Sequence, residues 1–114
     1  PACSNQHLPG YIQNAEQIKA KGVDIIGCIS VNDVFVMDAW GKNQNAGGKV
    51  LMLADGDGEF AKAAGLELDL TGKGLGMRSQ RYAMIIEDGT VKELEIEDGG
   101  KLEISTAEKL LAKL

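Results

Sequence analysis

Several features that define common classes of small protein are missing from this chain. It has two cysteines but no C-x-x-C pair, which argues against the usual zinc half-site and the usual dithiol redox motif. His7 is the only histidine, so a Cys2His2 metal site is impossible. No apolar run approaches the length of a membrane span, and no G-x-x-x-x-G-K-[ST] motif supports a phosphate-binding loop. We therefore expect no metal, no cofactor and no membrane partner.

Positive charge is also scarce. The chain has 12 Lys and Arg against 17 Asp and Glu, a formal net charge of −5, which makes nucleic acid an unfavourable partner. Its 114 residues are 44% hydrophobic, which is enough for a core and indicates a single domain, 1–114, without repeats. No secretory signal precedes Pro1, and the chain does not begin with Met, so an upstream targeting segment remains an alternative.

Hydrophobic spacing and turn residues predict an α/β domain in the order helix, strand, helix, strand, helix, strand, strand, helix. The expected helices are 3–21, 34–42, 59–64 and 105–114, and the expected strands are 23–31, 49–54, 82–87 and 90–97. The first two strands are apolar almost throughout, which is typical of burial on both faces. Asp88-Gly89 predicts a hairpin turn, whereas 66–78 reads as an irregular, glycine-rich segment. In 90–97, Glu93, Glu95 and Glu97 alternate with apolar residues, so we expect one solvated face.

Cys3 is the first candidate for chemistry. It lies in or beside the first turn of the first predicted helix, where unpaired N–H groups and the helix dipole favour an anion. A thiol in that place ionises more easily than one in water, and the thiolate is the nucleophile. The alternative is a small residue that merely packs. His7 shares its helix face and would be the only partner for a Cys/His pair, but we expect an ordinary polar residue on the helix surface.

Further motifs lie along the whole chain. They are P-x-C-S-x-x-H-L-P-G-[FY] at 1–11, C-[IV]-S-V-N-D at 28–33, F-V-M-x-A-W-G at 35–41, L-A-D-G-x-G-E-F at 53–60, G-L-E-L-D-L at 65–70 and R-[SR]-x-R-[YF] at 78–82. Each motif alone is weak, but together they are highly specific. The chain resembles the peroxiredoxins, and within them the type II group linked to glutaredoxin and glutathione.

This resemblance implies a thioredoxin-like fold and a thiol-dependent peroxidase that reduces hydrogen peroxide and alkyl hydroperoxides through a cysteine sulfenic acid. It places the peroxidatic cysteine at Cys3 and the active-site arginine at Arg81, which would stabilise the thiolate and the peroxide. The backbone N–H groups of Ala2 and Cys3 would bind the substrate. Glutaredoxin with glutathione, or thioredoxin, would be the reductant. In some members a second cysteine resolves the first, which makes Cys28 the alternative resolving residue, although a position in the middle of a strand favours an inert thiol.

The resemblance also implies a part of the protein upstream of this chain. The family motif P-x-x-x-T-x-x-C places a Pro and a Thr before Pro1, together with preceding strands. We therefore expect 1–114 to be a thioredoxin-like domain that is incomplete at its N-terminus and not independently stable. The competing interpretation is a non-catalytic thioredoxin-like binding module or an inactive fragment.

The resemblance further suggests a homodimer, and we expect a cytoplasmic protein. Ala112-Lys113-Leu114 is close to the S-K-L peroxisomal address, which makes the peroxisome one alternative. An organelle reached through an unseen N-terminal segment is another.

Overall fold

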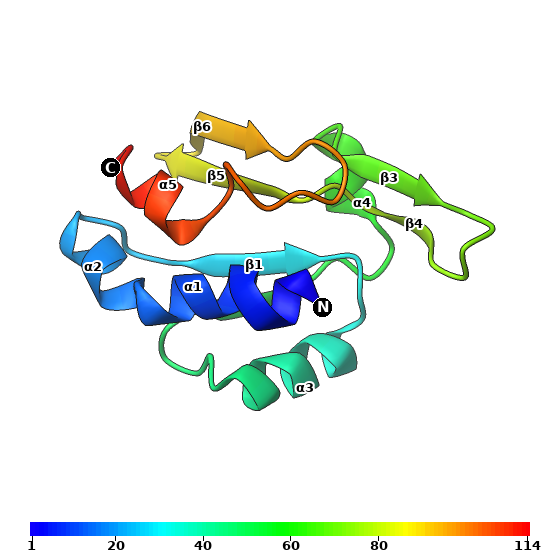
Figure 1. Cartoon of the computed structure of the whole chain (residues 1–114), viewed down its shortest axis with the longest axis horizontal. Coiled ribbons are helices and arrows are strands. Elements are labelled where there is room, and N and C mark those ends of the chain that lie inside the picture. Colours follow the sequence, from blue (N-terminus) through cyan, green and yellow to red (C-terminus); the bar gives the residue numbers. More distant parts are fainter. The chain divides into compact units, whose positions relative to one another are not determined.

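The computed structural model describes residues 1–114, which divide into two compact units. Unit 1 consists of Pro1–Asp24 and Arg81–Leu114, and unit 2 consists of Ile25–Gln80. In Figure 1 the elements of unit 1 are blue or yellow to red, and those of unit 2 run from cyan to yellow-green. None of the helices combines the length and the apolar character that crossing a membrane would require.

Unit 1 begins with a helical run of three segments. They are the π-helix η1 (Cys3–His7) and the α-helices α1 (Leu8–Gln13) and α2 (Ala15–Ala20). The helix predicted over 3–21 therefore has nearly the expected extent, but it is divided into three segments instead of being continuous. In η1 the N–H of Leu8 donates to the carbonyl of Cys3, five residues earlier. Pro9 has no N–H to offer the carbonyl of Asn5, so the wider π turn fits this sequence. Asn14 separates α1 from α2, and its side-chain amide donates to a carbonyl one turn earlier at 2.8 Å.

A β-hairpin forms the second part of unit 1. It consists of β5 (Tyr82–Glu87) and β6 (Thr90–Ile96), which pair antiparallel. Asp88 and Gly89 join the strands with positive φ angles of 51° and 78°, as the favoured two-residue hairpin turns require. The predicted hairpin is therefore confirmed. The register shifts between Ile85 and Ile86, which leaves Lys92 without a partner in the ladder and makes a β-bulge.

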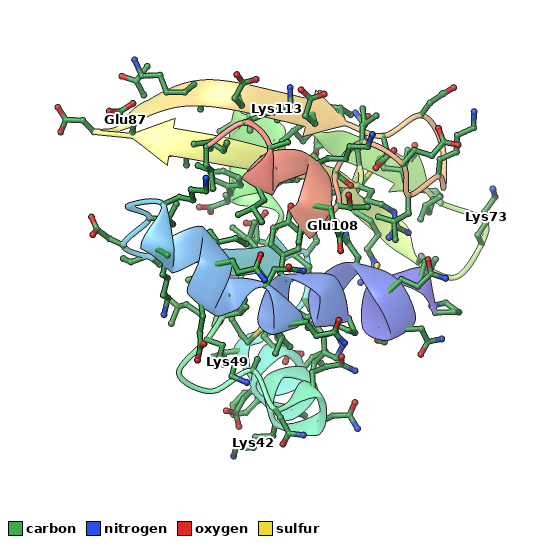
Figure 2. The ribbon with its side chains drawn as sticks, turned by 60° about the vertical axis from the view of Figure 1, so that its left-hand side comes forward. Lys42, Lys49, Lys73, Glu87, Glu108 and Lys113 are labelled. Carbon is green, nitrogen blue, oxygen red and sulfur yellow. The ribbon has the colours of Figure 1, made fainter.

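The last helix, α5 (Ala107–Leu111), contacts both α1 and β5 (Figure 1). It is shorter than the predicted 105–114, because the Thr106 hydroxyl caps it by accepting the N–H of Lys109 at 3.3 Å. Beyond the helix, Lys113 forms ion pairs with Glu95 at 3.1 Å and with Glu93 at 3.8 Å. Figure 2 shows Lys113 beside the hairpin.

The two faces of β6 differ from the simple expectation of a solvated glutamate face. Leu94 and Ile96 are 39% and 38% exposed, whereas Glu93 and Glu95 are half-buried. Glu97, directly after β6, is only 5% exposed. The glutamates are less exposed than expected because they form ion pairs with the end of the chain and hydrogen bonds to the loop before α5. Alternation of residue types along a strand cannot predict such long-range contacts.

Unit 2 contains a parallel pair of strands, β1 (Gly27–Ser30) and β2 (Leu51–Ala54), connected through α3 (Val34–Gln44). α3 packs against β2, and Met37 on this helix is 1% exposed. Asp33 caps α3, because its carboxylate accepts the N–H of Val36 at 2.8 Å. The helix also approaches β2 closely at Gly41, where a Cβ atom would lie 2.8 Å from the Cγ of Met52.

The prediction that the first two strands are buried on both faces is wrong. Leu51 and Leu53 in β2 are 54% and 40% exposed, and Ile25 just before β1 is 69% exposed. Burial on both faces requires a covering layer on each side of the sheet. This sheet has two strands, and α3 packs against β2.

The expectation of an irregular segment over 66–78 is also wrong. After α4 (Glu59–Ala63), the chain forms an antiparallel hairpin of β3 (Glu67–Leu70) and β4 (Gly76–Ser79). The alternation of leucines at 66, 68 and 70 is the strand signal that the abundance of glycine obscured. Gly72 and Gly74 have φ angles of 89° and 80°, so these glycines serve the turn of the hairpin.

Candidate active site

Cys3 is the first residue of η1, and its side chain is exposed. The preceding residue, Ala2, already has helical φ and ψ angles of −62° and −37°. The N–H of Asn5 donates to the carbonyl of Pro1 at 2.8 Å, so the N–H groups of Ala2 and Cys3 fall in the first turn. Helix geometry gives such N–H groups no earlier carbonyl to bond.

Arg81 is brought to Cys3 by the hairpin. It stands directly before β5, and its Nη1 donates to the Cys3 Sγ at 3.5 Å. Its carbonyl accepts the N–H of Glu97 at 2.9 Å, which fixes the backbone at this point. The Nε atom is buried without a hydrogen-bond partner. The structure therefore brings together the two residues that the sequence analysis named for catalysis.

His7 differs from the surface residue that the sequence predicted. It is half-buried, and its Nε2 lies 2.9 Å from the carbonyl oxygen of Ser105. Because a carbonyl can only accept, Nε2 carries the proton in this contact. Burial lowers the pKa of His7 and nearby Arg81 lowers it further, while the bond to Ser105 and the charge of Glu97 act in the opposite direction. This engagement gives His7 a structural role and does not support a general base.

Tyr11 makes a second bond to the same carbonyl. Its hydroxyl donates to the Ser105 oxygen at 2.8 Å, and its ring lies edge-on to His7 with centroids 5.6 Å apart. Burial and the charge of Glu108 both raise the pKa of Tyr11, which keeps the hydroxyl a neutral donor. Two side chains of the Cys3-bearing helical run therefore converge on one oxygen atom.

Glu97 holds Ser105 from the other side. Ser105 is 0% exposed, and both its N–H and its hydroxyl donate to the Glu97 Oε2 at 2.7 Å. The same oxygen accepts the N–H groups of Glu103 and Ile104 at 2.9 Å. Burial raises the pKa of Glu97, but these hydrogen bonds outweigh it, so the pKa lies below its ordinary value. Ser105 was not predicted from the sequence, and Glu97 was assigned to a strand face, because no local pattern links the two residues.

Cys28 belongs to unit 2, in β1, whereas Cys3 belongs to unit 1. Both cysteines are thiols, and Cys28 is half-buried. The fully buried strand that was expected to make Cys28 inert is therefore not observed. A resolving role for Cys28 stays a prediction.

The comparisons with known proteins agree with these features. The family model described as Redoxin matches residues 1–111. Over 114 residues the chain is 54% identical to Peroxiredoxin-2C of Oryza sativa subsp. japonica, of which it covers 70%. This chain belongs to the peroxiredoxins. It is also 49% identical over 116 residues to the chloroplastic Peroxiredoxin-2E of Arabidopsis thaliana, although it spans 50% of that relative's length.

Solved structures of peroxiredoxins confirm the fold. Reduced Prx3 from Vibrio vulnificus, in complex with hydrogen peroxide, is 59% identical and superposes with a TM-score of 0.95. The oxidized form of that protein is 60% identical and gives a TM-score of 0.90. All of this chain is covered in both comparisons, together with 73% and 71% of the respective neighbours. The predicted α/β, thioredoxin-like fold of the peroxiredoxin type is therefore correct.

Proposed function

We propose that this peroxiredoxin chain reduces hydrogen peroxide and alkyl hydroperoxides, with Cys3 as the peroxidatic nucleophile. The contact of 3.5 Å between the Arg81 Nη1 and the Cys3 Sγ is the observation that supports this role most directly. It pairs an accessible sulfur with a cation whose planar donors can serve a thiolate and an adjacent oxygen together.

In the first step, the thiolate of Cys3 attacks one oxygen of the peroxide. The S–O bond forms as the O–O bond breaks, sulfur gives up two electrons, and the second oxygen leaves as hydroxide or alkoxide. Protonation of this leaving group yields water or an alcohol, and Cys3 becomes a sulfenic acid. Arg81 would donate to the developing oxyanion. The first-turn N–H groups of Ala2 and Cys3 would hold the peroxide.

In the second step, an external thiol regenerates Cys3. The thiolate attacks the sulfenic sulfur, an S–S bond forms as the S–O bond breaks, and the hydroxide that leaves takes up a proton to become water. A second thiol then exchanges with this mixed disulfide. Glutaredoxin with glutathione, or thioredoxin, is the reductant that we propose. Cys28 remains the alternative resolving residue, in which case the first disulfide would be intramolecular.

We also propose a homodimer. Val34, Phe35 and Val36, in the first turn of α3, are 61%, 81% and 47% exposed. Large apolar side chains that are exposed at consecutive positions favour coverage by another protein, and a second copy is the occupant that we propose. For the compartment we propose the cytoplasm, with the peroxisome or another organelle as alternatives; two of the relatives are named as chloroplastic.

Peroxide consumption with glutathione and glutaredoxin tests this function against a non-catalytic binding module. The parent protein and Cys3→Ser are compared, and intact mass is recorded after peroxide treatment. We expect peroxide turnover and a mass gain of one oxygen in the parent. We expect no turnover and no oxidation of residue 3 in Cys3→Ser. Equal consumption by the two proteins, or no consumption by the parent, would favour the binding module.

A further inference from the structure

We propose that Glu97 is a positioning residue for the Cys3–Arg81 pair. Its carboxylate fixes Ser105, whose carbonyl in turn anchors the helical run that presents Cys3. This inference rests on the proposed function, since positioning matters for chemistry only where Cys3 reacts.

The carboxylate of Glu97 organises the loop that precedes α5. One oxygen, Oε2, accepts three consecutive backbone N–H groups, from Glu103 to Ser105, at 2.7–2.9 Å, and it also accepts the Ser105 hydroxyl at 2.7 Å. The side chain is 5% exposed, so water competes little for these bonds. Hydrogen bonds to an ionised acceptor are roughly twice as strong as neutral ones, so the charge of Glu97 matters for this loop.

The Ser105 carbonyl connects this loop to the Cys3-bearing segment. It accepts from the His7 Nε2 at 2.9 Å and from the Tyr11 hydroxyl at 2.8 Å. Cys3, His7 and Tyr11 follow one another at intervals of four, which places them along one face of the helical run. A displacement of Ser105 would therefore be transmitted to the face that presents the thiol.

The backbone of Glu97 reaches the other partner of the pair. Its N–H donates to the carbonyl of Arg81 at 2.9 Å, and the Nη1 of Arg81 meets the Cys3 Sγ. The contacts form a closed ring: Glu97 to Ser105, Ser105 to the helical run, the helical run to Arg81, and Arg81 to Glu97. One residue thus constrains both the sulfur and the guanidinium. Displacing a reacting group by about 1 Å can cost ~100-fold in rate, so this constraint has a measurable consequence.

The test uses Glu97→Gln in the intact protein. The amide is similar in shape but neutral, so its oxygen can still accept from the loop, without the charge that strengthens these hydrogen bonds. We expect the second-order rate constant for oxidation by hydrogen peroxide to fall by about 10-fold or more, as the geometry loosens. We also expect a changed pH profile for the alkylation of Cys3 by iodoacetamide, which a merely stabilising role would leave unaltered. Both are measured well below the unfolding temperature.

Glu95→Gln is the matched control. Glu95 lies on the same strand two residues earlier and pairs with Lys113 at the surface, so its neutralisation leaves the ring intact. We expect parental oxidation and alkylation rates for this variant. The same loss of rate in both variants would show a general effect of charge and would overturn the inference.

Three further outcomes also decide the matter. If folded Glu97→Gln is oxidised and alkylated at the parental rates, even with a lowered unfolding temperature, then Glu97 only stabilises the fold and the inference is overturned. If Glu97→Gln does not fold, Tyr11→Phe removes one donor to the Ser105 carbonyl; a fall in both rates supports the ring, and parental rates overturn it. If the parent shows no Cys3-dependent turnover, the proposed function fails, while the alkylation profiles still decide the positioning role.

Discussion

Replacing Arg81 with lysine tests the contact with Cys3 directly, because the substitution retains the positive charge and removes the planar guanidinium. The Nη1–Sγ contact of 3.5 Å is the interaction that the shorter, single-headed ammonium would lose. A hydrogen bond from a charged donor contributes about 1.5–3 kcal/mol. If this contact acts mainly in the transition state, oxidation by peroxide should slow by about 10- to 150-fold, at ~1.4 kcal/mol for each factor of ten.

The stability of the protein should change much less than the rate. The Arg81 Nε is buried without an acceptor, and a buried, unsatisfied donor costs about 1–3 kcal/mol. Lysine removes this donor, which offsets the packing lost with the guanidinium. We therefore expect the free energy of unfolding of Arg81→Lys to stay close to that of the parent.

Stopped-flow oxidation over a range of hydrogen peroxide concentrations measures the rate constant, and denaturant unfolding measures the stability. Arg78→Lys is the matched control, because its guanidinium donates within unit 2 to the Val31 carbonyl and to the Asn32 side chain, both at 3.0 Å. It should lower the stability and leave the oxidation rate of the folded protein unchanged. An unchanged rate in Arg81→Lys would remove Arg81 from the mechanism.

Three further predictions address other parts of the chain. Cys3→Ser should abolish peroxide turnover, whereas Cys28→Ser should retain it with glutaredoxin and glutathione; a folded but inactive Cys28→Ser would make that thiol the resolving residue. The pKa of His7 in the folded protein lies below 6.5, so the stability that neutral His7 contributes is present above pH 6.5 and is lost as the pH falls through 6.5 towards the folded-state pKa. Unfolding measured against pH should show this loss in the parent and not in His7→Gln, and identical pH profiles would contradict it. Gly41→Ala should cost about 1–3 kcal/mol, since a Cβ there would lie 2.8 Å from a side-chain carbon of β2, whereas Gly47→Ala meets nothing within 4 Å; equal unfolding midpoints would contradict the steric argument.

Local chemistry made much of this protein predictable from its sequence. The Asp88-Gly89 turn and the order of most elements follow from interactions between residues close together in the chain. The motifs around Cys3 and Arg81 indicated the family and named both members of the contact at 3.5 Å. The β3–β4 hairpin was missed, although its alternating leucines are also a local signal.

Only the tertiary structure decided which polar groups surround that contact. The sequence predicted His7 as a surface residue and Glu97 as part of a solvated strand face. Both are hydrogen-bonded to Ser105, which is 98 residues from His7 in the sequence. Burial was misjudged for the same reason in β1 and β2, whose apolar composition predicted a covering layer on both faces, although Leu51 and Leu53 are exposed. Hydrophobic period and turn chemistry act over a few residues, whereas burial and polar partners depend on which distant segments the fold brings into contact.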